Sequence, residues 1–466
     1  MDSLRTVYAG YAQKYERMRT DSMETNGTIA RERLGKLFDG GSFTELDALR
    51  TERDEKAAVI CAHGYVEGQA VYAFAQSPDL GGGAMGRAAA GKILRVLHLA
   101  AKTGTPVVGV YDSNGVFVDG TADSLSCYGK LIANVSNLSG VVPMISVVAG
   151  VCAGSAALMA ATADFLLMTK DAELYLTPPF GTDAAKAETA AKAGIAAAVL
   201  DDDAAAMDKV RALLRKLPAN NLAGAPICEF AEPDGSGECI CMKIADMDSA
   251  LPVYKAFGKS VGTAFATIKG LTVGFVNTSR TEDALTVDDC TKIARFVRTC
   301  DAFSIPVITI VDTVGFAADN EAARTGSLRA MTALCGAYAE ATTIKIALIT
   351  GEACGAAFSA LAGRGAGTDY VIAWDSASIS PMRAEAAVEF LWHDKLKGAD
   401  NADTKRTELA KEYRATLASA AKAAELGVVD SVIAKADTRQ AICDALDLLE
   451  GKRVSGSPKK HSNIPF

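Results

Sequence analysis

The chain has 466 residues, 49% hydrophobic and 22% charged, and is too long for one compact core, so it should divide into two or three domains. Aromatic residues make up only 6% of the chain, so aliphatic side chains must form most of the core, which indicates an α/β protein. The net charge of −8 argues against nucleic acid as a partner, because no general basic field would attract a phosphate backbone.

The N-terminal region is charged and has no apolar signal core, so we expect a cytoplasmic protein whose chain begins with a helix over residues 11–20. Residues 131–163 carry no charge and are numerous enough for a membrane helix. They include Gly140, Pro143 and Gly150, however, and these breakers favour a buried strand, a turn and a helix.

The most informative feature is an internal repeat at an offset of 200 residues. KILRVLHLAAKTGTPVVGVYD, which begins at Lys92, matches KIARFVRTCDAFSIPVITIVD, which begins at Lys292, without a gap. A glycine follows each copy (Gly115 and Gly315), then a helix, a second strand, a turn of small residues, another helix and a third strand. The recurring order predicts two duplicated halves of the same α/β fold, each with a mostly parallel sheet.

Residues 218–248 are rich in Pro, Asn and Gly and read as the linker between the halves. We therefore place the two domains at residues 1–222 and 223–466. The eleven cysteines are scattered through hydrophobic segments, and the tightest pair, Cys239 and Cys241, lacks zinc-type spacing. Reduced thiols and no bound metal are expected.

Two turns of small residues are the strongest candidates for a reactive site. CAGSAA begins at Cys152 and CGAAFSA begins at Cys354, each between a strand and a helix. Small residues leave N–H groups unblocked at the helix start, which suits an oxyanion hole. One such turn is better explained by close packing of a helix on a sheet, but two at matched positions favour the oxyanion hole. The predicted donors are Gly154, Ser155, Ala356 and Ala357, with Gly355 relaxing the second turn.

The whole chain resembles the biotin-dependent acyl-CoA carboxyltransferases. Nine segments carry the resemblance, in this order: ARERLGKLFDGGSFTELD, LGGGAMGRAAAGKI, DSLSCYG, SGVVPMISVVAGVCAGSAA, LPANNL, KIARFVRTCDAF, AYAEAT, DYVIAW and KKHSNIPF. Short glycine turns alone would be weak, but nine ordered segments across both halves are a specific signal.

The resemblance implies a crotonase-type fold in each half and a homo-hexamer built as a trimer of dimers, with the active site between two subunits. It implies that the first turn (Gly154, Ser155) binds the acyl-CoA thioester oxygen and that the second (Ala356, Ala357) binds the biotin ureido oxygen. Residues 1–222 would then be the acyl-CoA-binding domain and residues 223–466 the biotin-binding domain. The predicted substrate-binding residues are Gly82, Gly83, Gly115, Gly315, Phe316, Gly355 and Ser359, the last falling where the family varies a residue that helps set acyl chain preference.

The implied reaction moves a carboxyl group between biotin and a short-chain acyl-CoA, in an acyl-CoA carboxylase or a biotin-dependent acyl-CoA decarboxylase. The chain contains neither a Met-Lys-Met biotin attachment segment nor an ATP-grasp motif. The implied partners are therefore a biotin carboxyl carrier protein and either biotin carboxylase or membrane decarboxylase subunits, the latter placing the chain at a membrane periphery.

Four segments depart from the family pattern. DSNGVFVDG replaces DSGGARIQEG, about twenty residues are lacking between Pro179 and Ala197, AADNEAA follows Phe316, and Arg383 stands where a glycine is usual. These changes fall around the expected cleft, so a non-catalytic structural paralogue in a larger complex is the principal alternative.

Two further motifs suggest other activities. GKSVG at residues 258–262 matches a nucleophile elbow, but its surroundings predict a helix or loop entering a strand, whereas an elbow needs a strand followed by a helix. LGGGAMGRAAAGK lacks the Gly-Lys-Ser/Thr ending of a phosphate loop and reads as a turn and helix start. The four histidines (His63, His98, His393 and His461) have no partner at catalytic spacing and read as packing or surface residues.

Overall fold

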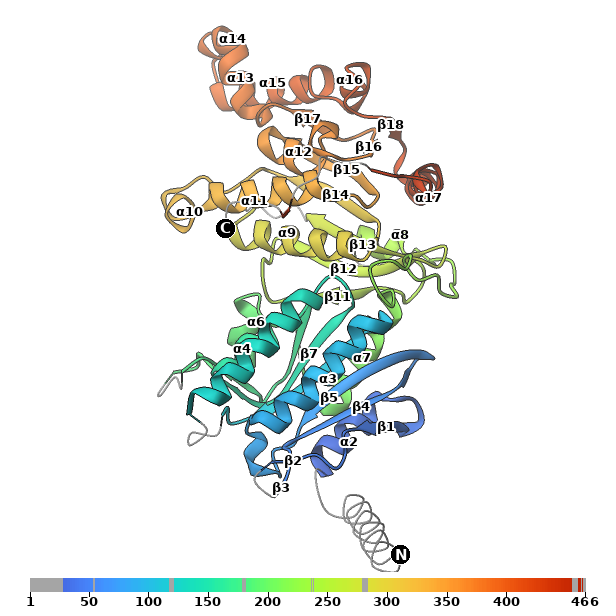
Figure 1. The fold of residues 1–466 in the computed structure, drawn as a ribbon. Helices are drawn as coiled ribbons and strands as arrows, with labels where there is room; N and C mark the ends of the chain where they lie inside the picture. The colour runs from blue at the N-terminus through green and yellow to red at the C-terminus, as the bar shows by residue number, and fades with distance from the viewer. Residues whose placement is uncertain are drawn as a thin grey trace, which may run out of the picture. The chain divides into compact units, whose positions relative to one another are not determined.

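The computed structural model describes residues 28–52, 55–116, 121–177, 182–235, 237, 239–278, 284–454, 460–461 and 463. The chain divides into two compact units, Met1–Ala223 and Gly224–Phe466, so the division lies one residue from the expected position. Figure 1 labels the elements of both units. The helix expected over residues 11–20 lies outside the described residues.

The first unit is built on a sheet with the strand order β1-β4-β5-β6-β7-β8-β10, and β9 pairs with β7 off this path. The strands from β5 to β10 run parallel, whereas β1, β4 and β5 pair antiparallel. Its strands are β1 (Phe43–Leu46), β2 (Thr51–Glu52), β3 (Glu55–Lys56), β4 (Val59–Val66), β5 (Gln69–Gln76), β6 (Val107–Ser113), β7 (Met144–Ala153), β8 (Phe165–Thr169), β9 (Glu173–Tyr175) and β10 (Ala198–Leu200). Its helices are α2 (Thr28–Leu37), α3 (Arg87–Thr103), α4 (Thr121–Leu138), α5 (Ser155–Ala161), α6 (Ala187–Lys192) and α7 (Asp203–Lys216).

The second unit repeats this topology, with the order β11-β12-β13-β14-β15-β16-β18 and β17 paired to β15. Its strands are β11 (Leu251–Val253), β12 (Val261–Ile268), β13 (Leu271–Thr278), β14 (Val307–Thr313), β15 (Lys345–Cys354), β16 (Tyr370–Trp374), β17 (Ser378–Ser380) and β18 (Ser431–Ile433). Its helices are α8 (Ile240–Ile244), α9 (Val287–Ala302), α10 (Asn320–Thr325), α11 (Ser327–Glu340), α12 (Gly355–Leu361), α13 (Ala384–Leu391), α14 (His393–Lys397), α15 (Ala402–Thr416), α16 (Ala420–Glu425) and α17 (Thr438–Leu449).

The matching strand orders confirm the predicted duplication, element by element. The repeated segment forms α3 and β6 in the first unit and α9 and β14 in the second. Both helices have a buried apolar stripe, and α9 begins with a capping box between Thr286 and Asp289. Helices α3 and α4 lie side by side, as do α9 and α11 (Figure 1), so each unit covers its sheet in the same way.

The uncharged stretch over residues 131–163 forms the end of α4 and all of β7 and α5. This confirms the expected succession of strand, turn and helix. Within the described parts of the chain, the helices are all too short or too polar to cross a membrane. The expected linker is more ordered than its composition suggests, because residues 240–244 form α8 and Arg439 of α17 bonds to Ile244 and Asp246.

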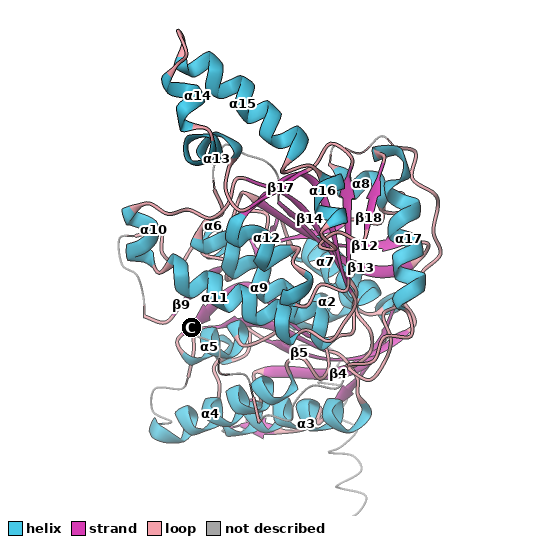
Figure 2. Cartoon of the chain, turned by 90° about the horizontal axis from the view of Figure 1, so that it is seen from above, coloured by secondary structure: helices cyan, strands magenta, loops and turns pink. Residues whose placement is uncertain are grey.

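Helices α13 to α15 extend away from the second sheet and have a small core of their own (Figure 2). Val388, Leu409 and Tyr413 lie in that core, and Trp392 packs against it. Phe390 and Leu391 at the end of α13 remain exposed. The group is therefore a separately packed extension of the second unit.

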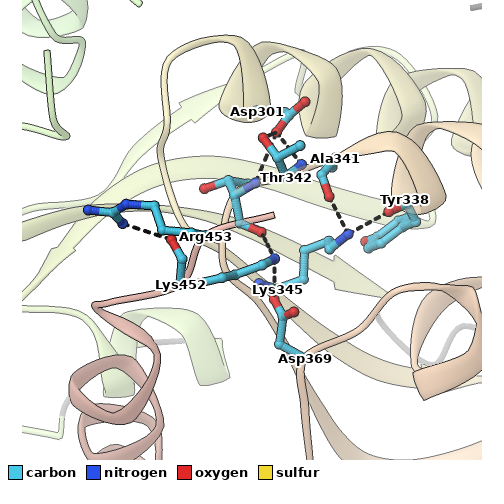
Figure 3. A network of polar contacts seen from close by, with 9 residues as sticks. Asp301, Tyr338, Ala341, Thr342, Lys345, Asp369, Lys452 and Arg453 are labelled. Carbon is cyan, nitrogen blue, oxygen red and sulfur yellow. Dashed lines mark hydrogen bonds and ion pairs between the residues drawn. The ribbon is translucent and has the colours of Figure 1, made fainter. Parts of the chain in front are cut away.

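A polar network fastens the segment after α17 to the second sheet (Figure 3). Lys452 donates from Nζ to the Asp369 carboxylate at 2.8 Å and to the Thr343 carbonyl at 2.6 Å. Lys345, which is buried, donates to the carbonyls of Tyr338 and Ala341 at the end of α11. Charged groups thus bind carbonyls left open at the end of α11 and beside the start of β15.

Candidate functional site

The first candidate turn lies between β7 and α5. β7 ends at Ala153, Gly154 has φ +61° and α5 begins at Ser155. A positive φ is accessible to glycine with little strain, which explains a glycine at the point where the chain reverses into the helix. Ser155 is partly exposed, so the start of α5 is open on this side.

The Gly154 N–H is already used within the turn. It donates a 2.8 Å hydrogen bond to the carbonyl oxygen of Tyr175, the last residue of β9. The prediction that Gly154 supplies a free donor is therefore wrong, because this N–H extends the pairing of β7 with β9. The first N–H in the turn without a partner inside the helix is that of Ser155.

The second turn has the same backbone course. Gly355 has φ +55° after the last strand residue, Cys354, and it occupies the place of Gly154. The offset between the units is thus 201 residues at this point (355 − 154), so Ser155 corresponds to Ala356. Ala356 is exposed, whereas Ala357 is only 1% exposed. The expected role of Ala357 as a donor is not supported, and Ala356 is the accessible residue.

A second N–H group borders each turn. In the bridge between Leu285 and Phe316, the Leu285 N–H donates to Gly315 and the Ala317 N–H donates to Leu285, both at 2.9 Å. The Phe316 N–H must then point to the other side of the strand, toward β15 and its turn. Cys354 confirms that this side is close, because its Sγ lies 3.5 Å from the Val314 carbonyl.

Val116 holds the corresponding position in the first unit. It forms a parallel bridge with Met85, whose N–H donates to Gly115 at 2.9 Å. Sequence reasoning included Phe316 but missed Val116, which the 200-residue offset of the repeat would have identified. Each unit therefore has a strand-end N–H and a helix-start N–H at the same end of its central strands, from Val116 and Ser155 in the first unit and from Phe316 and Ala356 in the second.

The predicted glycines shape the strand end beside each turn. Gly82 and Gly83 form a short 3-10 turn in which a Cβ at Gly83 would lie 2.2 Å from the Asp112 carbonyl oxygen. Gly115 has φ +111° and Gly315 has φ +118°, and both N–H groups bond to the hydroxyl two residues earlier. At Gly83 a side chain would clash with the backbone, whereas at Gly115 and Gly315 it is the positive φ that favours glycine.

Ser359 lies one helical turn beyond Gly355 on α12 and is exposed, so its hydroxyl is on the open side of the second turn. Arg383 comes directly before α13, and Pro381 in the same loop packs its carbonyl over Gly355. Burial raises the pKa of the Cys354 thiol, Glu352 raises it further and Arg383 lowers it. Burial also raises the pKa of Cys152. Both cysteines are therefore neutral thiols at pH 7 and not nucleophiles.

Ser260 does not lie in a nucleophile elbow. It occupies a turn that leads into β12, and its N–H donates to Asp289 at 3.2 Å, which confirms a loop entering a strand. LGGGAMGRAAAGK forms the turn before α3 and the start of that helix. The four histidines are exposed, and in the ranges that the structure describes no three His, Cys, Asp or Glu residues cluster as metal ligands.

The carboxyl transferase domain model matches residues 22–464. The chain belongs to the carboxyl transferase domain family. It is 35% identical over 492 aligned positions to the methylmalonyl-CoA decarboxylase alpha subunit of Propionigenium modestum, covering 96% of this chain and 95% of the relative. It is 33% identical to a biotin-dependent acetyl-/propionyl-coenzyme A carboxylase beta5 subunit of Mycobacterium tuberculosis, covering 94% and 89% of the two chains.

Among solved structures, transcarboxylase 12S matches with a TM-score of 0.89 at 32% identity, covering 100% of this chain and 99% of that one. That structure is described as a hexamer assembly with hydrolysed methylmalonyl-coenzyme A bound. Membership of the carboxyl transferase family and the two-domain crotonase-like fold are thereby confirmed.

Proposed function

We propose that this chain is the carboxyltransferase subunit that moves a carboxyl group between biotin and a short-chain acyl-CoA. The observation that carries the proposal is the duplication of one arrangement, in which a bridge at a strand end and a helix start that follows a glycine of positive φ occur together in each unit. Carboxyl transfer involves two oxygens that gain charge, the thioester oxygen of the acyl-CoA and the ureido oxygen of biotin. Two separate N–H pairs match two such oxygens.

The first pair, Val116 and Ser155, would receive the thioester oxygen, and the second pair, Phe316 and Ala356, the ureido oxygen. A fixed N–H donor stabilises developing charge by about 3 kcal/mol where water is excluded. With both oxygens held, the ureido nitrogen exchanges a carboxyl group for the α-proton of the thioester. The chain supplies position and hydrogen bonds, which fits turns whose cysteines are neutral thiols.

The proposed complex contains a separate biotin carrier protein and either a biotin carboxylase or membrane decarboxylase subunits. Several copies of this chain would assemble as a trimer of dimers, in which the first turn of one copy faces the second turn of another. The relatives named as subunits of a decarboxylase and a carboxylase support the multi-subunit arrangement, and the transcarboxylase 12S hexamer supports the assembly. This carboxyltransferase would work in the cytoplasm, at a membrane in the decarboxylase case.

The alternative is a non-catalytic paralogue within such a complex, suggested by the altered segments around the turns. Two observations favour the catalyst. The relatives are named as enzyme subunits, and the open N–H positions at Ser155 and Ala356 persist in this chain.

Turnover of acyl-CoA decides between the two. Purified protein is incubated with free biotin and, in separate reactions, malonyl-, methylmalonyl- and glutaconyl-CoA, and the decarboxylated thioesters are separated by chromatography. We expect biotin-dependent loss of the carboxyl group from at least one of them. Absence of turnover with all three, in protein that still binds CoA, would favour the structural paralogue.

A further inference from the structure

The central strand of each sheet bends at the same place. In the pairing of β6 with β7, Tyr111 faces Val148, but Ser113 faces Cys152. Asp112 alone therefore stands opposite residues 149–151, so β7 contains two extra residues at this point. The second unit repeats the irregularity, because Val311 faces Ile349 and Thr313 faces Ala353.

The bulge redirects the strand. Before it, β7 pairs with β8, and after it β7 pairs with β9. In the same way β15 pairs first with β16 and then with β17. Bulges bend a strand and change the direction of the residues that follow, so this bulge sets where the turn with the free N–H group lies.

One carboxylate lies inside each bulge. Asp112 Oδ1 accepts a hydrogen bond from the Val151 N–H at 3.3 Å, and Asp312 Oδ1 accepts one from the Glu352 N–H at 2.9 Å. A Cβ at Gly150 would lie 2.2 Å from the Asp112 side chain, and one at Gly351 would lie 2.3 Å from Asp312. The carboxylate thus replaces the strand partner that the extra residues lose, in a space that glycine keeps open.

We propose that Asp112 and Asp312 are positioning residues for carboxyl transfer, each holding the bend that sets the distance between the two N–H groups of its own unit. In the first unit this distance separates Val116 and Ser155, and in the second it separates Phe316 and Ala356. The inference rests on the proposed function. Asp112 acts on the acyl-CoA side alone and Asp312 on the biotin side alone.

The two units differ in how the carboxylate is held. Arg33 of α2 donates to Asp112 Oδ2 at 2.7 Å and to the Ala149 carbonyl, inside the bulge, at 3.0 Å. The same guanidinium pairs with Asp203 of α7 at 2.8 Å. An arginine therefore fastens the first bend to two helices, whereas Asp312 is held through the Glu352 N–H of its own strand pair.

Matched controls exist at the other end of the same strands. Asp164 accepts the N–H of Met144, the first residue of β7, at 2.8 Å. Asp301 accepts the N–H groups of Thr342 and Thr343, just before β15, at 2.6 and 3.0 Å (Figure 3). Replacing these carboxylates removes comparable backbone hydrogen bonds far along the strand from the turns, so Asp164→Ala and Asp301→Ala report a purely structural loss.

Amide hydrogen exchange in full-length protein tests the bend without an activity assay. We expect Asp112→Ala to accelerate exchange in residues 150–158 by about tenfold or more, and Asp312→Ala to do the same in residues 351–359. Each variant should leave the other unit's segment unchanged, and Asp164→Ala and Asp301→Ala should leave both unchanged. The inference would be overturned if exchange in the bends were unchanged in Asp112→Ala and Asp312→Ala. Equal acceleration by the control variants would also overturn it, whether or not the protein is active.

Binding and kinetics test the link to transfer. Asp112→Ala should weaken acyl-CoA binding, measured by calorimetry without biotin, by about tenfold, and Asp312→Ala should leave it unchanged. Asp312→Ala should raise the KM for free biotin, and Asp112→Ala should not. Asp312→Asn should recover most of the loss, because the amide oxygen still accepts the Glu352 N–H.

If both alanine variants change the acyl-CoA affinity and the KM for biotin alike, the assignment of the two residues to separate sides is wrong. A wild-type protein that binds CoA without turnover would refute the proposed function and leave the exchange result standing.

Discussion

The N–H of Gly154 donates to the carbonyl oxygen of Tyr175 at 2.8 Å, so the glycine that begins the first turn also ends the pairing of β7 with β9. This hydrogen bond fixes the direction in which α5 leaves the sheet. The next N–H, that of Ser155, is consequently the first one directed to the open side. Gly154 is thus a conformational requirement of the turn, and Ser155 is the proposed donor.

Proline at Ser155 or Ala356 removes the proposed N–H donor while the helix can still form. Proline is well tolerated in the first turn of a helix, where it removes an N–H that the helix does not use. We expect Ser155→Pro to lower kcat by about 100-fold through the acyl-CoA side, and Ala356→Pro to lower it similarly through the biotin side. Steady-state turnover of the active thioester with free biotin measures both.

Side-chain replacements that keep the N–H are the controls. Ser155→Ala and Ala356→Ser should stay within about threefold of wild-type activity, because the proposed donors are backbone groups. A large loss in Ser155→Ala would instead assign the role to the hydroxyl. Full activity in Ser155→Pro would remove this N–H from the proposed mechanism.

The sequence was sufficient for the duplication because apolar patterning survives in both copies. KILRVLHLA and KIARFVRTC keep the same buried helical stripe, and the strands that follow carry Asp112 and Asp312 one residue before their ends. Both turns could be predicted as well, because a run of small residues directly after an apolar strand is recognisable in the sequence. The assignment of Gly154 failed because its N–H bonds to Tyr175 in a strand 21 residues later, and the two turns were aligned at an offset of 202 residues (356 − 154) where the positive-φ glycines give 201 (355 − 154).

The bends could not be predicted from the pattern. Residues 144–153 are apolar or small throughout, so no break in periodicity marks the bulge in β7. Hydrogen bonding between distant segments is equally invisible, and nothing near Arg33 in the sequence indicates that it pairs with Asp112 and Asp203. These features depend on tertiary contacts 79 and 170 residues apart in the chain.

Removal of Arg33 should destabilise the first unit strongly. The side chain is 7% exposed and pairs with Asp112 and Asp203, so Arg33→Met leaves two carboxylates without their cation. Loss of one partner from a buried ion pair costs about 3–5 kcal/mol. Thermal or urea unfolding should show this loss, and the double variant Arg33→Met/Asp203→Asn should recover part of it. Arg87→Met, which breaks an exposed pair with Asp123, should change the Tm little.

Buried Lys292 should make the free energy of unfolding depend on pH in the alkaline range. Burial lowers the pKa of Lys292 to about 8. An unfolded lysine has a pKa of about 10.4, so between these values the unfolded chain binds more protons than the folded one. The contribution of Lys292 to stability therefore rises from pH 8 to pH 10.4, by roughly 3 kcal/mol at most. Urea unfolding of wild type and Lys292→Met across this range should show the difference growing in favour of wild type. A difference that stays constant across this range would show that burial does not lower the pKa of Lys292.

The segment after α17 should depend on Lys452 for its attachment. Its Nζ bonds to the Asp369 carboxylate and the Thr343 carbonyl, and a charge-assisted hydrogen bond of this kind contributes about 2 kcal/mol. Lys452→Met should lower the Tm of the second unit and speed proteolytic cleavage after Leu449. Burial and then the charge of Lys452 lower the pKa of Lys345, so the same variant should raise that pKa. Arg453→Met is the matched control, because Arg453 is exposed and, among the residues that the structure describes, donates only to the Lys452 carbonyl. Equal destabilisation by the two variants would mean that the segment is held by its backbone and not by the Lys452 side chain.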